Sequence, residues 1–205
     1  MDIWQLAYLN KQRRQAQGVP PLPATDPLLQ PRALERVLEA RGWLRRIAGE
    51  TDFALAANAA RKALALGRGL LLTGAAGVGK THLLKALAAL PPFSGNLIRL
   101  PFEIATFDPH LDESIANYLL AQNLLIDDLG TEPTHNNFGL LCQHTGEFII
   151  RYTTEGQGRL LITTNLTPQA ISTRYGDRIA QRIFERTVVT RLSGHTKRQF
   201  IISNH

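Results

Sequence analysis

The chain has 205 residues, a length that suffices for one full α/β domain and a small appendage. Hydrophobic residues make up 44% and charged residues 20%, as in ordinary soluble globular proteins. No apolar run approaches the roughly 20 residues of a bilayer span, and the N-terminal basic residues follow a mixed stretch, unlike a secretory signal. The single cysteine, Cys142, excludes an intrachain disulfide and a cysteine-rich zinc site. These features predict a cytoplasmic protein.

The formal net charge of +6 is unevenly distributed along the chain. Residues 1–50 carry eight Lys and Arg against five Asp and Glu, residues 51–170 eight against ten, and residues 171–205 seven against two. Basic ends favour an anionic partner such as nucleic acid. A solvated surface that keeps the protein soluble accounts for the same excess, so the charge alone leaves both interpretations open.

The first 50 residues are predicted to form a helical extension. Residues 2–17 have the spacing of a short amphipathic helix, in which Trp4 and Tyr8 lie one turn apart. The stretch 18–31 holds five prolines and predicts an extended linker, because proline lacks an amide donor and fixes φ. We expect the helix either to dock in a groove of a partner protein or to fold back onto the rest of the chain.

From residue 32 onward, segments with helical and strand patterns follow one another, and residues 51–205 are expected to form one domain. Helices are predicted at 32–48 and 52–66, with Gly67 ending the second. The strands expected are 69–73, 96–100, 123–128, 159–164 and 187–192, the later helices are 80–89, 112–122, 137–154, 168–175 and 178–185, and an edge strand is expected near Phe200. Apolar strands alternating with helices predict a parallel sheet covered on both faces.

The segment GAAGVGKT, residues 74–81, follows an apolar run, precedes a good helix and fits the phosphate-loop pattern G-x-x-x-x-G-K-[ST]. Its glycines let backbone amides face phosphate oxygens, and the following helix directs its N-terminal dipole at the same anion. Lys80 is expected to reach the β- and γ-phosphates, and the Thr81 hydroxyl to bind Mg²⁺. The predicted nucleotide contacts are Gly74, Ala75, Ala76, Gly77, Val78, Gly79, Lys80, Thr81 and His82.

Two carboxylates end the apolar strand NLLIDDLG. A buried strand that ends in paired carboxylates favours a cation nearby, although a pair of turn aspartates is the simpler alternative. We expect Asp127 to hold Mg²⁺, mostly through water, and Asp128 to orient the attacking water. Glu132 is a weaker candidate for the second task. Many ATPases carry a glutamate at this second position, so the shorter Asp128 predicts slow turnover.

Another apolar strand, within RLLITTNLTPQA, ends in polar residues. In the predicted sheet this strand lies between the strand before the phosphate loop and the acidic strand. Asn165 is then expected to reach the γ-phosphate and the attacking water, whereas in isolation it would be an ordinary turn residue. Thr167 and Pro168 predict a helix start, with Thr167 as the N-cap and Pro168 at the first position.

The segment YGDRIAQRIFER places Arg178, Arg182 and Arg186 on one helical face, and Asp177 is expected to cap this helix. The three arginines form either a solvated face or a finger offered to the nucleotide of a neighbouring subunit. We expect the finger to be Arg182, with Arg178 second.

The stretches GAAGVGKTHLL, LLIDDLGTEP, LLITTNLTPQ and RYGDRIAQRI occur in this order. Together, over roughly residues 52–198, they resemble the AAA+ ATPases of the bacterial helicase-loader group (DnaC and DnaI type) and their relatives, the IstB-type transposition ATPases. The phosphate loop alone is generic, but DDLGTEP followed by TTNL and YGDRI is much narrower. IstB-type chains more usually read Asp-Glu-Leu-Gly at the acidic strand, so Asp128 favours the loader group.

The resemblance implies a P-loop AAA+ three-layer sandwich, here with no evident C-terminal lid domain. It implies ATP and Mg²⁺ as cofactors, side-by-side assembly into a ring or spiral, binding of single-stranded DNA and delivery of the replicative helicase. Asn165 matches the first sensor of the family and Arg182 its finger, with Arg178 beside it. Residues 193–198, SGHTKR, match a basic stretch near the C-terminus of the family.

Two departures from the family bear on the partner. The N-terminal part carries no zinc-ligand cluster, and the stretch between Lys80 and Asp127 leaves little room for a DNA-contacting insertion. Two alternatives therefore stay open beside the loader. One is a transposition regulator that forms an ATP-dependent filament on DNA. The other is a nucleotide-gated adaptor with little turnover, which Asp128 favours.

Overall fold

A computed structural model gives the fold of the chain. It describes residues 21–30, 32–40, 50–90, 92–93, 95–99, 120–131 and 140–194, without the side chains of residues 40, 50, 95–99 and 140–144. The sequence predictions that fall outside these ranges are the helix 2–17, nearly all of the helix 112–122, Glu132, the strand near Phe200 and most of the basic stretch 193–198.

The centre of the fold is a five-stranded parallel sheet with the strand order β2-β3-β4-β1-β5. Its strands are β1 (Gly69–Gly74), β2 (Gly95–Arg99), β3 (Asn123–Leu129), β4 (Leu160–Thr164) and β5 (Thr187–Leu192). All five strands were predicted within one residue at either end. The prediction that β4 lies between β1 and β3 is also confirmed, so the carboxyl ends of these three strands lie side by side.

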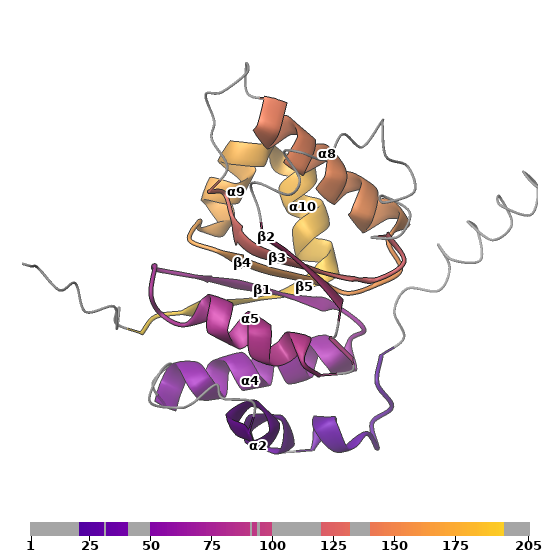
Figure 1. Cartoon of the computed structure of the whole chain (residues 1–205), viewed down its shortest axis with the longest axis vertical. Coiled ribbons are helices and arrows are strands. Elements are labelled where there is room, and N and C mark those ends of the chain that lie inside the picture. Colours follow the sequence, from indigo (N-terminus) through magenta and orange to yellow (C-terminus); the bar gives the residue numbers. More distant parts are fainter. Residues whose placement is uncertain are drawn as a thin grey trace, which may run out of the picture.

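Helices cover both faces of the sheet, which gives the three layers that the sequence predicts (Figure 1). One face carries α4 (Glu50–Ala65) and α5 (Lys80–Ala88), with α2 (Ala33–Ala40) packed outside them. The other face carries α8 (Leu140–Glu155), α9 (Pro168–Tyr175) and α10 (Asp177–Arg186). Within the described residues, no helix combines the length and the apolar character needed to span a bilayer.

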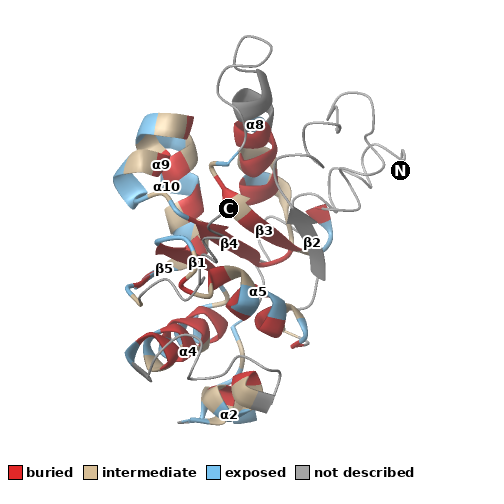
Figure 2. Cartoon of the chain, turned by 60° about the vertical axis from the view of Figure 1, so that its left-hand side comes forward, coloured by how far each residue is buried: buried red, intermediate tan, exposed pale blue. Residues whose placement is uncertain are grey.

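The core consists of two apolar clusters, one on each face of the sheet. Leu125 and Leu161 belong to the cluster under α4 and α5, and Ile126 and Ile162 to the cluster under α8–α10. Neighbouring residues of a strand therefore face opposite layers, as the two-residue period of a strand requires. Figure 2 shows buried residues along the strands and on the helix faces turned toward them. The strands β1, β3 and β4 are thus buried on both sides, which explains their continuous apolar runs.

The ends of three helices follow local sequence signals. Gly67, at φ 64°, ends α4 as predicted, with its amide bonded to the Leu64 carbonyl. Thr167 caps α9 as predicted, since its hydroxyl accepts from the Ala170 amide at 3.1 Å. The expected cap of α10 is wrong: Gly176 occupies the cap position and Asp177 is the first helical residue. Asp177 still lies in the first turn, where a carboxylate complements the helix dipole.

The described residues that precede α4 lie against the domain. The Leu22 amide donates to the Leu64 carbonyl at 3.1 Å, and Leu28 and Leu29, from the short 3₁₀ helix η1 (Pro27–Leu29), pack against the core. Leu34 and Leu38 of α2 are fully part of that core. Leu22, Leu28 and Leu29 thus hold this part of the expected linker against the domain, and the domain boundary near residue 51 stays a prediction.

Candidate nucleotide-binding site

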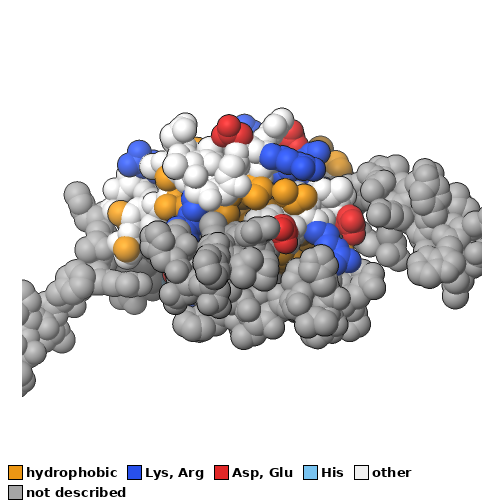
Figure 3. Space-filling view, turned by 90° about the horizontal axis from the view of Figure 1, so that it is seen from above, with side chains coloured by type: hydrophobic (Ala, Val, Ile, Leu, Met, Phe, Trp, Pro, Cys, Tyr) orange, Lys and Arg blue, Asp and Glu red, His pale blue; other side chains and the backbone are white. Residues whose placement is uncertain are grey.

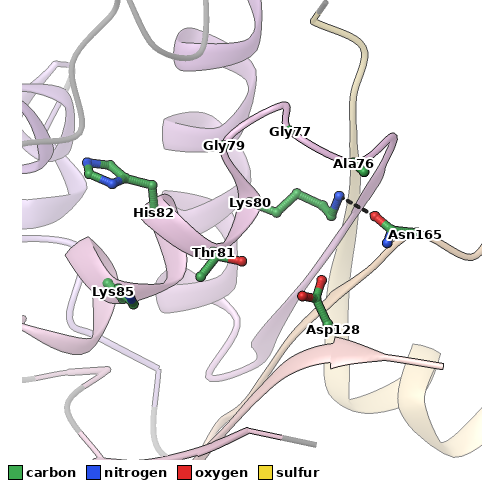
Figure 4. A pocket seen from close by; sticks show the side chains of 9 residues that line it. All are labelled: Ala76, Gly77, Gly79, Lys80, Thr81, His82, Lys85, Asp128 and Asn165. Carbon is green, nitrogen blue, oxygen red and sulfur yellow. Dashed lines mark hydrogen bonds between the residues drawn. The ribbon is translucent and has the colours of Figure 1, made fainter. Parts of the chain in front are cut away.

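A polar cavity of about 380 Å³ lies where β1, β3 and β4 end, next to the start of α5. Ligands of open parallel sheets bind at this position, beyond the carboxyl ends of the strands. The residues that line the cavity are Ala76, Gly77, Gly79, Lys80, Thr81, His82, Lys85, Asp128 and Asn165 (Figure 4). Eight of these nine were predicted site residues, and they come from three segments that are distant in sequence.

The phosphate loop connects β1 to α5, and its backbone fits an anion. At Gly74 the loop passes so close to β5 that a Cβ atom would overlap the Leu192 carbonyl oxygen. Gly79, at φ 97°, begins α5 without a side-chain cap. The first amides of a helix have no intrahelical acceptor, so here they and the helix dipole favour a bound phosphate. Val78 anchors the loop, because its side chain is only 2% exposed and lies in the core.

Lys80 connects the loop to β4 across the cavity. Its ammonium group donates to the carbonyl oxygens of Gly74 and Ala75 and to Asn165 Oδ1, each at 2.8 Å. The side chain is only 4% exposed, so these acceptors stabilise a charge that water scarcely reaches. Figure 4 shows the Lys80–Asn165 hydrogen bond at the mouth of the loop. A phosphate group would offer the same ammonium charged oxygens, which are stronger acceptors than a carbonyl or an amide.

Behind the cavity, α5 and β3 bring a hydroxyl and a carboxylate together. Thr81 Oγ1 donates to Asp127 Oδ1 at 2.9 Å, and Asp127 is only 7% exposed. Mg²⁺ prefers a few protein oxygen ligands completed by phosphate oxygens and water. A threonine hydroxyl and a carboxylate beside a phosphate cradle fit that preference, so Thr81 and Asp127 are the residues that would hold the ion.

Asp128 lies on the cavity side of β3, and its carboxylate points toward the region where Lys80 and Asn165 meet (Figure 4). Its backbone has φ 58°, a value rare outside glycine. Its amide donates to Thr163 Oγ1 at 2.8 Å. The same hydroxyl group donates to Asp127 Oδ1 at 2.6 Å.

Two functional residues were not predicted: Lys85, which lines the cavity, and Thr163, which bonds to both Asp127 and Asp128. Thr163 was seen only as the polar end of an apolar strand, and its β-branched side chain is ordinary in any strand. Lys85 lies one helical turn after Thr81, and this four-residue spacing was the available signal. Gly74, Ala75 and Val78 were predicted nucleotide contacts but do not line the cavity. Gly74 and Ala75 contribute carbonyl acceptors to Lys80 instead.

The arginines of α10 lie outside this cavity. Arg178 and Arg182 are exposed, and Arg182 Nη1 lies 3.3 Å from Glu185 Oε2. On the described part of the face above α8–α10, basic and acidic side chains are interspersed (Figure 3). Arg186 differs from both, since its guanidinium donates to the carbonyl oxygens of Gly156 and Gly158 at 2.9 and 3.3 Å. It fixes the loop between α8 and β4.

Comparison with known proteins gives a match in structure only. No family model and no curated protein matches the chain. A solved structure of the DnaC helicase loader superposes on 90% of this chain and 99% of its own, with a TM-score of 0.51 and 20% sequence identity. The chain shares the fold of that structure, a three-layer α/β sandwich with a phosphate loop between β1 and α5. The predicted fold class is therefore confirmed, and the predicted resemblance holds at the level of the fold.

Proposed function

We infer that the chain is a Mg²⁺-dependent ATPase of the helicase-loader type. The observation that carries this inference is the meeting of the phosphate loop, the acidic end of β3 and Asn165 in one cavity. Each of these three features occurs in many proteins by itself. Together, within reach of one γ-phosphate, they are the groups that a nucleotide-hydrolysing site requires. The DnaC-like fold supports the loader type rather than another P-loop class.

The residues of the cavity divide the work of phosphoryl transfer between them. The phosphate loop and the ammonium of Lys80 bind the phosphates, and Lys80 leaves its carbonyl acceptors to do so. Thr81 and Asp127 would hold Mg²⁺, which would supply positive charge beside the phosphate oxygens. Asp128 accepts a hydrogen bond from the attacking water, and Asn165, freed from Lys80, orients that water or the γ-phosphate. A single short carboxylate at position 128 is consistent with slow hydrolysis.

Hydrolysis in this proposal requires a second copy of the chain. Among the described residues, no arginine lines the cavity, whereas Arg178 and Arg182 are exposed on α10. A guanidinium that neutralises charge in the transition state is therefore supplied by a neighbouring subunit, with Arg182 as the finger and Arg178 beside it. The site is completed by assembly into a ring or spiral, and turnover depends on protein concentration.

The partners proposed are single-stranded DNA and the replicative helicase of the same organism. The DnaC protein that shares the fold is described as a helicase loader, and the basic C-terminal part of this chain favours an anionic ligand. A transposition regulator of the IstB type has the same nucleotide chemistry and stays the second candidate. A nucleotide-gated adaptor with little turnover is the third, and the shorter Asp128 is the observation that favours it.

Native mass spectrometry of the protein with that helicase, with and without ATP, separates these candidates. The loader proposal predicts an ATP-dependent complex of defined stoichiometry, and the Lys80→Ala variant is the control that must not form it. If no complex forms but the protein assembles on DNA with ATP, the transposition regulator replaces the loader. Assembly with ATP but without phosphate release would favour the adaptor.

A further inference from the structure

Asp127 and Asp128 are consecutive in β3, yet both serve the same cavity. Along a regular strand, successive side chains point to opposite faces. Leu125 faces the α4–α5 layer and Ile126 the α8–α10 layer, so Asp127 falls on the α5 side and Asp128 should face α8. Asp128 nevertheless lines the cavity. The backbone must therefore depart from the regular strand between Asp127 and Asp128.

The departure is a β-bulge opposite Thr163. The pairing of β3 with β4 runs in register to Ile126 and Ile162 and resumes with Leu129 opposite Thr164. Two residues of β3, Asp127 and Asp128, thus face one residue of β4. Bulges of this kind redirect side chains and are frequent beside active sites. The φ of 58° at Asp128 is the local backbone change that turns its carboxylate toward the nucleotide.

The Thr163 hydroxyl stabilises this arrangement at both carboxylate-bearing residues. It accepts from the Asp128 amide, which in a regular ladder would bond to a backbone carbonyl, and it donates to Asp127 Oδ1. Thr163 is completely buried, so water cannot replace either bond. The donated bond also fixes the oxygen of Asp127 that accepts from Thr81, which limits the orientations of that carboxylate.

We propose that Thr163 is a positioning residue that sets the distance and direction of both carboxylates toward a Mg²⁺–nucleotide complex. The proposal rests on the proposed function of the cavity and assigns a role to a residue that does not line it. Groups that hold a metal-binding carboxylate in place typically change metal affinity about 10- to 100-fold when removed. Thr163 acts through Asp127 and Asp128, so its loss should affect Mg²⁺ far more than the nucleotide alone.

The test compares the full-length protein with Thr163→Val, Thr163→Ala and Thr163→Ser variants. Valine keeps the shape of the side chain but replaces the hydroxyl with a methyl group beside the Asp128 amide. Alanine removes the hydroxyl without placing a methyl group there. Serine keeps the hydroxyl. Thr187→Val is the matched control, because Thr187 is equally buried in β5 and its hydroxyl bonds to the Ile183 carbonyl at 2.7 Å, near the opposite end of the sheet. Binding of a fluorescent ATP analogue is titrated with Mg²⁺ and in EDTA, and circular dichroism identifies the folded variants.

Folded variants without the hydroxyl should need about tenfold more Mg²⁺ to reach half of the Mg²⁺-dependent increase in binding of the ATP analogue. Their nucleotide affinity in EDTA should stay within about twofold of wild type. Thr163→Ser and Thr187→Val should both match wild type in Mg²⁺ requirement. A folded Val or Ala variant with the wild-type Mg²⁺ requirement overturns the role of Thr163, as does a Ser variant as impaired as the Val variant. A wild-type protein that binds no nucleotide overturns the proposed function instead, and with it this inference.

Discussion

The two ends of the central strands carry buried polar side chains that bond in different ways. At the carboxyl ends, side chains from α5 bond to side chains from β3 and from the end of β4, as in Thr81–Asp127 and Lys80–Asn165, in addition to their bonds to the backbone. At the amino ends, the bonds run from side chains to the backbone. Arg159 Nη1 donates to the Pro92 carbonyl at 3.0 Å, and the Tyr152 hydroxyl to the Gln122 carbonyl at 2.7 Å.

Burial has consequences for the ionisable groups of the amino end. It raises the pKa of the Tyr152 phenol above the ordinary value, and it lowers the pKa of the Arg159 guanidinium. Both shifts have desolvation as their main cause, as expected for groups whose partners are neutral carbonyls. Arg159 is 6% exposed and Tyr152 is completely buried.

This difference determines where a ligand can replace a protein contact. Bonds between side chains of separate elements can be exchanged for bonds to phosphate or Mg²⁺ without unfolding a strand. Bonds to backbone carbonyls that join β3, β4 and α8 cannot be exchanged without loosening the fold. Substitutions at the carboxyl ends should thus affect nucleotide chemistry, and substitutions at the amino ends should affect stability.

Lys80→Ala should produce the largest effect, because every step that uses bound ATP is lost together with ATP binding. Loss of the charged hydrogen bonds to the phosphates is expected to weaken ATP binding at least about a hundredfold, since bonds to charged groups contribute about 1.5–3 kcal/mol each. The thermal midpoint should change little. Isothermal titration calorimetry and a thermal melt measure both quantities. ATP affinity within threefold of wild type would contradict the assignment of the phosphate loop.

Arg182→Ala should leave ATP binding intact but reduce the hydrolysis that depends on assembly by about 10³-fold, the lower end of the range for arginine fingers. Phosphate release is measured against protein concentration, with Arg178→Ala as the neighbouring variant of the same charge. Mixing Arg182→Ala with Lys80→Ala should restore part of the activity, because one shared site then holds an intact loop and an intact finger. Absence of rescue at every mixing ratio would argue against a shared site.

Asp128→Asn should reduce turnover about a hundredfold at unchanged ATP affinity, because the amide cannot act on the attacking water as a carboxylate does. Asparagine tolerates a positive φ about as well as aspartate, so the bulge should persist. A single-turnover assay beside a binding titration separates the two effects. Normal turnover would transfer the catalytic role to another carboxylate, and Glu132 is the first to test.

Tyr152→Phe is the counterpart at the amino ends and should give the smallest change, a loss of about 1 kcal/mol in the free energy of unfolding. ATP affinity should remain within about twofold of wild type. In the wild type, the Tyr152 phenol has a lower pKa in the unfolded state than in the folded state. Its contribution to the free energy of unfolding is therefore complete below about pH 10 and decreases as the pH rises further. Chemical denaturation at pH values between about 8 and 11 should show a weaker decline of stability in the variant than in the wild type. An equal decline in both proteins would contradict the role of Tyr152.

The sequence predicted the parts of the site that have a strong local signature. The glycines and Lys80 of the phosphate loop form a pattern that rarely serves another purpose, and the polar ends of β3 and β4 stand out against apolar runs. Their meeting also followed from the sequence, because a parallel sheet with β4 between β1 and β3 leaves no other place for Asn165.

The parts that the sequence did not predict depend on contacts between distant residues. The bulge at Asp128 requires knowledge of the partner strand, and Thr163 looks like any β-branched strand residue. Arg186 shares a helical spacing with Arg178 and Arg182, which predicts only that the three side chains leave the helix on the same side. The spacing does not reveal the carbonyl oxygens of the loop between α8 and β4 to which Arg186 donates. Gly176, rather than Asp177, is the cap of α10, because the chain turns there at φ 87°.

The cavity at the carboxyl ends should bind a Mg²⁺–nucleotide complex. A fluorescent ATP analogue titrated into the wild-type protein, with Mg²⁺ and then in EDTA, tests this most directly. We expect saturable binding at one site per chain that tightens with Mg²⁺ and is lost in Lys80→Ala but kept in Tyr152→Phe. Binding that is absent, or that survives the loss of Lys80 and depends on Tyr152, would contradict it.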